Sequence, residues 1–252
     1  MNVSAVLITR NEQENIEDAI RSVSWACEVV VVDAFSSDAT VQICRRSGAR
    51  VVQREWKGYV EQKNFAVSQA SLDWVLSLDA DERVSDALRD EVLQLQEKGF
   101  GGYRIPRRTF FLNQWIQRTS WSPDYQLRLF DRRRGRWHGG RLHESVRVEG
   151  RVGRLHSLLL HYSYRSVSDF LLRLDQYSQL AAQDCYERGR RTRSCHLLIG
   201  PLAAFFKSYV LKRGFRDGLA GLAVSGLGGA SIFFRYLKLL ELERRGESGS
   251  GE

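Results

Sequence analysis

Cysteine and proline are scarce in this 252-residue chain, which contains 4 and 3 of them respectively. The cysteines lie far apart and form no CxxC or CxH pattern, which argues against a disulfide framework or a zinc site and fits a reducing cytosol. The few prolines, and the lack of a Ser- or Gly-rich run before the last residues, argue against a long linker or a disordered arm. We therefore expect one large domain, or one domain with an appendage.

Targeting and phosphate-loop motifs are also missing. The opening apolar run 3–8 is short and lacks a basic flank, so it does not resemble a signal peptide, and we expect the protein to act in the cytoplasm. No GxGxxG or Walker A run occurs, which removes the main support for an NAD-binding or P-loop protein.

Positive charge dominates. The chain has 38 Lys and Arg against 30 Asp and Glu, a formal net charge of +8, which favours anionic partners such as nucleic acid, acidic lipid or a phosphorylated substrate. Two arginine clusters, 132–136 and 188–193, suit phosphate groups because the guanidinium fork binds them bidentately. A solvated basic surface is the alternative interpretation.

Strand and helix patterns alternate through the first hundred residues. Short apolar runs such as Val29–Val32 predict buried strands, and apolar residues at helical spacing separate them. Ser85 is an N-cap candidate, with Asp86 in the first turn after it. Alternation of this kind predicts an α/β domain with a mainly parallel sheet covered on both faces. The expected strands are 3–8, 29–32, 50–53 and 74–78; the expected helices are 11–23, 38–46, 61–70 and 85–96. Beyond residue 99 we expect strands at 103–105, 126–130 and 157–162, and an aromatic-rich segment without periodicity over 110–123 that suggests a substrate loop.

Polar residues stand at the ends of three predicted strands. Thr9 follows the first, Asp33 ends the second and Asp79 ends the strand 74–78. Because ligands of such sheets bind beyond the carboxyl ends of the strands, we expect these side chains to share one crevice. Asp33 there could accept hydrogen bonds from a ribose or a base, or could cap the turn that follows it.

Asp79-Ala80-Asp81 directly follows a predicted strand, so alternate residues can turn two carboxylates toward one ion. A hard cation such as Mg²⁺ or Mn²⁺ prefers oxygen ligands and completes its shell with diphosphate oxygens. A solvated turn before a helix is the alternative.

Four segments together resemble the family 2 glycosyltransferases with the GT-A fold: 6–12, 30–40, 62–64 and 74–82. The resemblance covers about the first hundred residues. It implies that Thr9, Glu12, Asp33 and Asp79 bind the nucleotide, and that Asp81, with Asp79, binds a divalent metal. It also implies that Lys63 lies near the diphosphate of a UDP- or ADP-sugar donor. The family's usual Ser-Gly pair after the second strand is replaced here by Ala34-Phe35.

The second half is similar to a narrower branch, the lipopolysaccharide core glycosyltransferases that add glucose or heptose, in segments 122–130, 142–144 and 201–218. An inverting transfer needs a base for the acceptor hydroxyl. By its position Asp124 is the expected base, and Glu144 is its rival. His143 is a candidate third metal ligand or phosphate contact, Arg128 a candidate phosphate contact, and Trp121 a candidate platform for an acceptor sugar.

From residue 166 onward the apolar spacing is helical, so we expect a GT-A domain over 1–165, with a donor half 1–100 and an acceptor half 101–165, and a helical appendage over 166–252. The uncharged run 218–234 and the apolar stretch 197–211 fit helices lying in a membrane interface better than two spanning helices. Packing against the catalytic domain or a sister subunit is the alternative. We accordingly expect a protein attached peripherally to the inner face of the cytoplasmic membrane.

The leading hypothesis is an enzyme that moves a hexose or heptose from a nucleotide-sugar onto a lipid-linked saccharide. A polyprenyl phosphate acceptor is a second enzymatic hypothesis, and a nucleotidyltransferase with a similar core is a third. A basic nucleic-acid-binding module is the non-enzymatic hypothesis. It is disfavoured because strand-end carboxylates repel phosphate, so we expect no nucleic-acid partner.

Overall fold

The computed structural model describes residues 1–96, 99–140, 144–164 and 166–248. The chain divides into two compact units, one containing residues 1–108 and 124–163 and the other residues 109–123 and 164 onward. The segment 109–123, which we expected in the acceptor half, therefore groups with the C-terminal helices.

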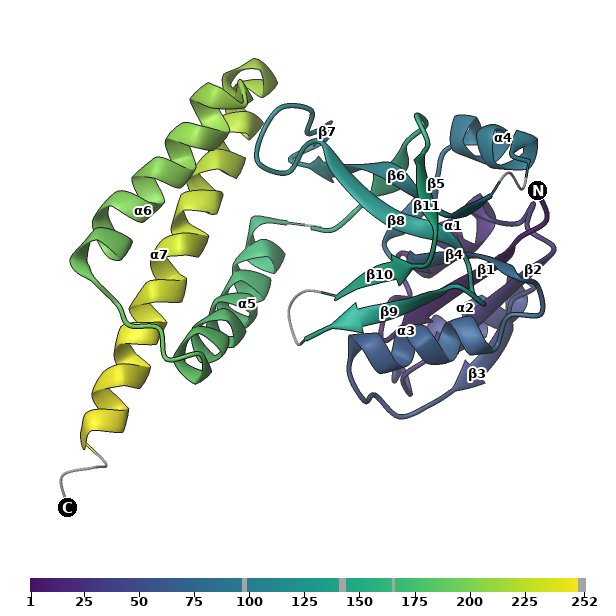
Figure 1. Ribbon diagram of the computed structural model, residues 1–252, viewed down its shortest axis with the longest axis horizontal. Coiled ribbons are helices and arrows are strands. Elements are labelled where there is room, and N and C mark those ends of the chain that lie inside the picture. The colour runs from purple at the N-terminus through teal and green to yellow at the C-terminus, as the bar shows by residue number, and fades with distance from the viewer. Residues whose placement is uncertain (97–98, 141–143, 165, 249–252) are drawn as a thin grey trace. The chain divides into compact units, whose positions relative to one another are not determined.

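The described residues form a mixed ten-stranded sheet, of which all strands but β7 lie wholly or mostly in the first unit and form its core (Figure 1). Its strand order is β3-β2-β1-β4-β8-β6-β12-β5, and both β7 and β11 pair with β6. The first four strands are parallel, and β8 then runs antiparallel to both β4 and β6. A separate hairpin pairs β9 with β10. The strands are β1 (Ser4–Thr9), β2 (Glu28–Asp33), β3 (Arg50–Gln53), β4 (Trp74–Asp79), β5 (Glu82–Val84), β6 (Phe100–Phe111), β7 (Gln114–Trp115), β8 (Asp124–Asp131), β9 (Gly135–Gly139), β10 (Glu144–Val148), β11 (Arg151–Arg154) and β12 (Leu159–His161).

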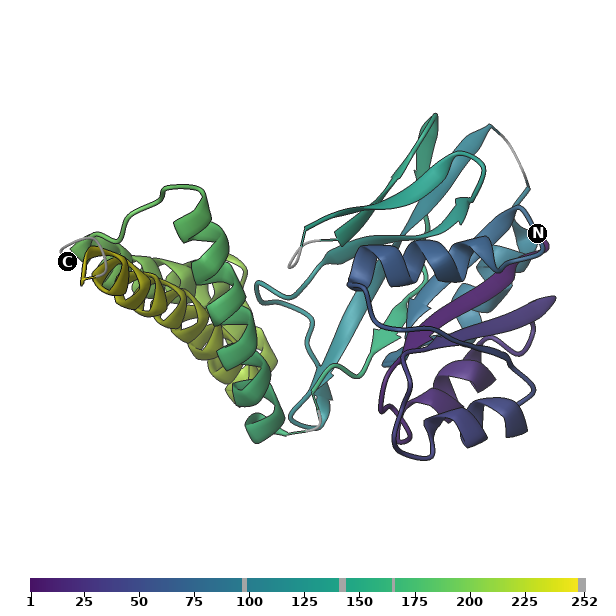
Figure 2. The ribbon, with the colours of Figure 1, turned by 90° about the horizontal axis from the view of Figure 1, so that it is seen from below.

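Both faces of the parallel strands are buried, because alternate residues of each strand point to opposite faces. In β1, Ala5 and Leu7 belong to one apolar cluster, and Val6 and Ile8 to another. Figure 2 shows α1 and α2 on one face of the sheet and α3 on the other. The helices of this unit are α1 (Ile16–Ser22), α2 (Thr40–Arg46), α3 (Tyr59–Ser68) and α4 (Asp86–Gln94).

All four predicted helices form, with shifted boundaries: the helices expected at 61–70 and 85–96 span 59–68 and 86–94, and the other two begin later than expected. The first helix begins at Ile16 rather than residue 11, because Asn11 has φ 55°, a left-handed conformation that a helix cannot include. The helix expected from residue 38 begins at Thr40, since the Asp38 carboxylate accepts the Thr40 backbone N–H at 3.0 Å and holds a turn there. The Ser85 cap is confirmed, because its side chain accepts the backbone N–H of Leu88.

Strands in the acceptor half were under-predicted. The strand expected at 103–105 extends over 100–111, and β7 folds back onto it where we expected an irregular segment. Strands β5, β9, β10 and β11 were not predicted. They are three to five residues long and each contains one or two charged side chains, so their pairing with other strands, rather than their periodicity, defines them.

Three helices make up most of the second unit: α5 (Val167–Glu187), α6 (Ser194–Phe206) and α7 (Gly218–Ser248). A π-helical turn η1 (Lys207–Leu211) and a 3₁₀ turn η2 (Gly214–Asp217) connect α6 to α7, and α7 packs against both α5 and α6 (Figure 1). The core of this unit contains Phe111, Ile116, Phe170, Leu174 and Val224.

Two helical segments of the described chain, 194–211 and 214–245, are long and apolar enough to cross a membrane by length and composition alone. Only 6% of the first segment, and 28% of an apolar 18-residue window of the second, is buried within the protein. Their apolar side chains therefore cover a largely exposed surface, which a soluble core helix would not do.

Candidate functional site

The polar side chains predicted at three strand ends lie at one edge of the parallel sheet. The register pairs Thr9 of β1 with Asp33 of β2, and Ile8 of β1 with Asp79 of β4. Since β1 lies between β2 and β4, these residues end neighbouring strands. The predicted clustering is confirmed, at the edge where open α/β sheets bind their ligands.

Asp33 is fully buried, and the loop after β2 holds its carboxylate. One oxygen accepts the Ser36 hydroxyl, and the other accepts the Ser36 backbone N–H at 2.9 Å and the Gln53 side-chain amide at 3.2 Å. These are the contacts of a turn-capping carboxylate, one of the two roles expected from the sequence. A contact with ribose or base requires Gln53 to move aside, so that role stays a prediction.

Thr9 and Glu12 occupy the loop after β1. The Thr9 hydroxyl is buried and has no hydrogen-bond partner among the described residues. The Glu12 carboxylate accepts the Asn15 side-chain amide at 2.8 Å, and the Glu12 backbone N–H donates to the Thr40 hydroxyl at 2.8 Å. Glu12 thus braces the loop, while the unpartnered Thr9 hydroxyl is available to a ligand.

Asp79 lies between two buried cations. Its Oδ1 is 2.9 Å from Lys63 Nζ, and its Oδ2 accepts Arg128 at 2.5 Å. Lys63 is 2% exposed and Arg128 3%, so neither cation is shared with bulk water. Lys63 and Asp79 thus form a buried ion pair, and the expected contact of Lys63 with a diphosphate stays a prediction. The structure also gives Asp79 two strong protein partners, which favours an orienting role over direct metal ligation.

Glu82 and Arg107 link the Lys63–Asp79–Arg128 ion pairs to Asp124. Glu82 is fully buried, and its Oε1 accepts both Arg128 at 2.6 Å and Arg107 at 2.8 Å. Arg107 also contacts Asp124 Oδ2, at 2.7 Å from Nη2 and 2.9 Å from Nε. One chain of alternating charges therefore joins the first acid of the Asp79-Ala80-Asp81 motif to the expected base. Neither Glu82 nor Arg107 was predicted as a site residue.

The charges in this chain stabilise one another. Burial by itself would raise the pKa of Asp79, but Arg128 and Lys63 outweigh it and hold that pKa well below its usual range. Burial would lower the pKa of Arg128, yet Asp79 and Glu82 raise it above its usual value. The pKa of Arg107 is raised in the same way, with burial opposing and Glu82 favouring the charged form. All three groups are therefore charged at neutral pH.

Glu144 and Trp137 complete the surroundings of Lys63. Glu144 Oε1 accepts Lys63 Nζ at 3.1 Å, so this candidate base contacts the same ammonium as Asp79. The Trp137 ring lies 4.3 Å from Lys63 Nζ, a cation–π contact, and its buried indole N–H has no hydrogen-bond partner among the described residues. Asn64 fixes this part of β9 by two hydrogen bonds to the Trp137 backbone.

The two candidate bases differ in how fully they are engaged. Both Asp124 oxygens accept hydrogen bonds, one from Arg107 and the other from Gln126 at 2.6 Å. Glu144 pairs with Lys63 through one oxygen, and its side chain is 21% exposed against 30% for Asp124. To take the proton of the acceptor's hydroxyl group, either carboxylate must give up a hydrogen bond to the protein or use a free lone pair.

Asp81 has a partner that was missed at the sequence level. His161 Nε2 lies 3.5 Å from Asp81 Oδ2, because β12 runs antiparallel to β5 and pairs His161 with Glu82. The backbone N–H of Tyr162 also donates to the Asp81 carbonyl at 2.9 Å. The strand containing His161 was predicted from its apolar residues, but its pairing with the acidic motif was not.

The donor set of Asp81 and His161 fits a divalent cation shared with a diphosphate. Among the described residues no group of three or more His, Cys, Asp or Glu side chains could hold a metal ion. Mg²⁺ and Mn²⁺ need no such cage, because one or two protein ligands, water and substrate phosphates fill their shells. Neighbouring ligands of such an ion lie about 3 Å apart, close to the Asp81–His161 separation.

Three other expected site residues have different positions. His143 lies outside the described residues. Arg128, the expected phosphate contact, already binds Asp79 and Glu82 inside the protein. Trp121 packs in the aromatic core of the second unit, with its ring centroid 5.6 Å from that of Phe111. The acceptor roles of Arg128 and Trp121 remain predictions, and their observed contacts are structural.

Together, the strand order, the acidic motif after β4 and the charged chain around it are those of a nucleotide-sugar transferase of the GT-A type. Residues 4–148 match the family model for glycosyl transferase family 2, and the chain belongs to that family.

Curated relatives align along nearly the whole chain. A lipopolysaccharide core biosynthesis glycosyltransferase, LpsC of Rhizobium meliloti, is 30% identical over 95% of this chain and 92% of its own length. An uncharacterized glycosyltransferase of Rickettsia bellii is 31% identical over 95% of this chain and 86% of its own length. Glycosyltransferase activity and the resemblance to a lipopolysaccharide core enzyme are thus supported across both units.

Solved structures agree on the fold. The mannosyltransferase PcManGT of Pyrobaculum calidifontis, in complex with GDP-Man and Mn²⁺, superposes with a TM-score of 0.54 at 16% identity, over 95% of this chain and 87% of that one. TarS of S. aureus, in complex with UDP-GlcNAc, superposes with a TM-score of 0.50 at 15% identity, over 98% and 92%. The predicted GT-A fold is confirmed.

Proposed function

We propose that the protein is an inverting, metal-dependent glycosyltransferase that moves a hexose or heptose from a nucleotide-sugar to a lipid-linked saccharide of the cell envelope. The observation that carries the proposal is the carboxyl edge of β1, β2 and β4, where Thr9, Asp33 and Asp79 meet beside the Asp81–His161 pair. The likeness to LpsC supports lipopolysaccharide core biosynthesis as the setting. A UDP- or ADP-sugar is the proposed donor.

In the proposed mechanism, Asp81 and His161 are the residues that would hold a Mg²⁺ or Mn²⁺ ion. When bound, the ion would supply Lewis-acid neutralisation of a departing nucleoside diphosphate. Lys63 adds a buried positive charge on the same side, and Asp79 and Glu144 fix the position of its ammonium. The Thr9 hydroxyl is a free hydrogen-bonding group for the nucleotide.

Asp124 is proposed to take the proton of the acceptor hydroxyl as that oxygen attacks the anomeric carbon, with Glu144 as the alternative base. Arg107 orients Asp124 through two contacts. Glu82 pairs with Arg107 and accepts the backbone N–H of Asp79, so it connects the proposed base to the donor site. The base and the donor site are therefore parts of one rigid charged chain, which maintains their separation during transfer.

The exposed apolar helices of the second unit support attachment to a membrane surface. Leu198, Leu202 and Leu219 are 66%, 70% and 85% exposed, which leaves apolar area free to enter a headgroup region. We propose peripheral attachment to the cytoplasmic face of the inner membrane, where a lipid-linked acceptor is available. The same helices support the second candidate, transfer to a polyprenyl phosphate. Self-association through this surface is the competing proposal.

Thermal-shift screening against UDP-, GDP- and ADP-sugars, each with Mn²⁺ or with EDTA, tests the donor assignment. A ligand that binds only the folded state raises its stability by about 2.7 kcal/mol at a hundred times its Kd. We expect one nucleotide class to raise Tm with Mn²⁺ and less with EDTA. If no nucleotide-sugar changes Tm under either condition, the proposed function is wrong.

A further inference from the structure

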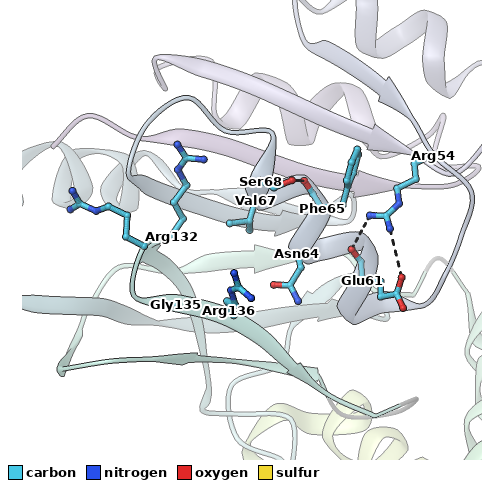
Figure 3. Close-up of a pocket in the computed structure, with 10 residues that line it drawn as sticks. Arg54, Glu61, Asn64, Phe65, Val67, Ser68, Arg132, Gly135 and Arg136 are labelled. Atoms are coloured by element: carbon cyan, nitrogen blue, oxygen red, sulfur yellow. Dashed lines mark hydrogen bonds and ion pairs between the residues drawn. The ribbon is translucent and has the colours of Figure 1, made fainter.

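A groove along α3 is lined by four arginines, Arg54, Arg132, Arg133 and Arg136, and by one acid, Glu61 (Figure 3). Its volume is about 550 Å³, enough for a sugar phosphate or a lipid headgroup. The arginines come from the loop after β3, the β8–β9 turn and β9, so the fold gathers charge from segments far apart in the sequence.

Arg132 and Arg136 have N–H groups without a hydrogen-bond partner among the described residues, unlike the other two arginines of the groove. Arg54 is paired with Glu61 at 3.6 Å, and Arg133 with Asp131 at 2.7 Å. The Arg132 Nε is buried without a hydrogen-bond partner, and no hydrogen bond or ion pair engages the Arg136 guanidinium anywhere in the described part of the chain. A buried guanidinium N–H needs an acceptor, and a phosphate oxygen in the groove would supply one.

The arginines of the β8–β9 turn lie away from the donor site, whereas Arg54, at the other end of the groove, follows β3 at the donor edge and donates its backbone N–H to the Asp33 carbonyl at 2.9 Å. Asp131, at the base of the β8–β9 turn, pairs with Trp74 at the start of β4, whereas Asp79 ends that strand. Five residue steps along a strand span on the order of 16 Å, so the donor diphosphate does not reach Arg132.

We propose that this groove binds a phosphate group, a monoester or diester, that is not the donor diphosphate. Arginine forks bind phosphate oxygens bidentately, and the groove's one acid is already neutralised by Arg54. A phosphate on the acceptor saccharide and a phosphate in a lipid headgroup share this chemistry.

Calorimetry with inorganic pyrophosphate in EDTA-containing buffer tests the site, with Arg132→Gln/Arg136→Gln as the variant. We expect its affinity for pyrophosphate to fall at least tenfold. The matched control Arg45→Gln/Arg46→Gln, which removes two charges from α2, and the donor-site variant Asp81→Asn should both bind as the wild type does. Equal weakening in the control, or no weakening in the groove variant, overturns the proposal.

Vesicles distinguish the two sources of phosphate. If the groove variant also loses binding to phosphatidylglycerol vesicles relative to the control, the site takes lipid headgroups. If vesicle binding is unchanged while pyrophosphate binding is lost, the site takes the phosphate of a soluble or saccharide ligand. Both results support a phosphate site, and both require that the control retain binding.

Phe35 supports a second, independent inference. It has φ 53° and is 57% exposed, although a bulky residue in the left-handed region is strained and an exposed aromatic ring gains little from burial. The loop is held in place: Asn11 N–H donates to the Ser36 hydroxyl at 2.8 Å, and Ser37 N–H donates to Asn11 Oδ1 at 2.9 Å. The ring is thus displayed on a braced, strained turn directly after Asp33.

Two more exposed aromatics follow the neighbouring strand. Trp56 and Tyr59, 38% and 40% exposed, form an edge-to-face pair with centroids 4.7 Å apart just beyond β3. Since β3 lies beside β2, the carboxyl edge of these two strands displays three aromatic side chains. Nucleobases stack on such rings whatever their identity.

We infer that the Phe35 ring is a stacking platform for the donor nucleobase. The inference rests on the proposed function, because it assumes a nucleotide at this edge. It also accounts for an aromatic residue at position 35, where glycine would relieve the backbone strain.

Phe35→Gly separates this role from a structural one. It removes the ring and the strain together, so we expect nucleotide Kd to rise roughly 5- to 150-fold while Tm stays level or rises. Phe35→Tyr should retain binding. Leu112→Gly is the matched control, because Leu112 has φ 50° and is 47% exposed but lies in the second unit.

The outcomes distinguish the inference from the function on which it depends. If the wild type binds a nucleotide and Phe35→Gly binds it equally well, the stacking role is wrong and the proposed function stands. If the wild type binds no nucleotide at all, the proposed function itself fails. A lower Tm in Phe35→Gly than in Leu112→Gly would assign Phe35 to packing instead.

Discussion

Glu82→Gln should destabilise the protein more than any exposed charge change of the same kind. Glu82 Oε2 accepts the Asp79 backbone N–H at 3.0 Å, while Oε1 accepts both Arg107 and Arg128. A glutamine of the same shape must point its NH₂ either at that N–H or at the two guanidiniums. Every orientation therefore leaves a buried donor facing a donor, in a residue with no solvent exposure. Breaking a buried charge pair in this way costs about 3–5 kcal/mol.

Urea unfolding followed by fluorescence measures this loss, and Glu61→Gln is the control. Glu61 also pairs with an arginine, but its side chain is 60% exposed, so its replacement should change the free energy of unfolding by less than about 1 kcal/mol. If Glu82→Gln unfolds within 1 kcal/mol of the wild type, the charged chain does not hold the first unit together as described.

Three further outcomes are expected. Asp124→Asn should retain donor binding while kcat falls roughly 10²- to 10⁴-fold; a dead Glu144→Gln beside an active Asp124→Asn would transfer the role of base to Glu144. Burial raises the pKa of the Cys44 thiol to about 12, so native protein treated with iodoacetamide at pH 8 should be alkylated only at exposed cysteines, and modification of Cys44 would contradict its placement. Leu198→Gln/Leu202→Gln should reduce partition onto anionic vesicles roughly tenfold or more, and unchanged flotation would mean that this surface serves another partner.

The carboxyl edge of β1, β2 and β4, where the proposed donor site lies, was predictable because each of its polar residues is adjacent in the sequence to the strand that positions it. Each acid follows its own apolar strand directly, and parallel strands covered on both faces end at the same edge. The register that pairs Thr9 with Asp33 follows from those strands alone. The GT-A fold could be inferred for the same reason, since the motifs and the strand–helix alternation occupy a continuous first hundred residues.

The acceptor side could not be predicted in this way. Arg107 reaches Asp124 because β6 and β8 are antiparallel and pair these two residues directly, and His161 reaches Asp81 through the pairing of β12 with β5. Such pairings join segments far apart in the sequence, and charged strands carry little alternation to reveal them. The packing of Trp121 could not be predicted for a related reason. Its aromatic neighbours in the chain resemble a binding loop, but helix α5 folds onto them and makes a core.

The most direct test of the metal-dependent donor site is calorimetry of nucleotide diphosphate binding, with Mn²⁺ and with EDTA, to the wild type, Asp81→Asn and His161→Gln. We expect the wild type to bind more tightly with Mn²⁺ than with EDTA, and each variant to lose that Mn²⁺-dependent gain while its Tm without ligand is retained. Undiminished Mn²⁺-dependent affinity in Asp81→Asn would contradict the assignment of the metal to this acid.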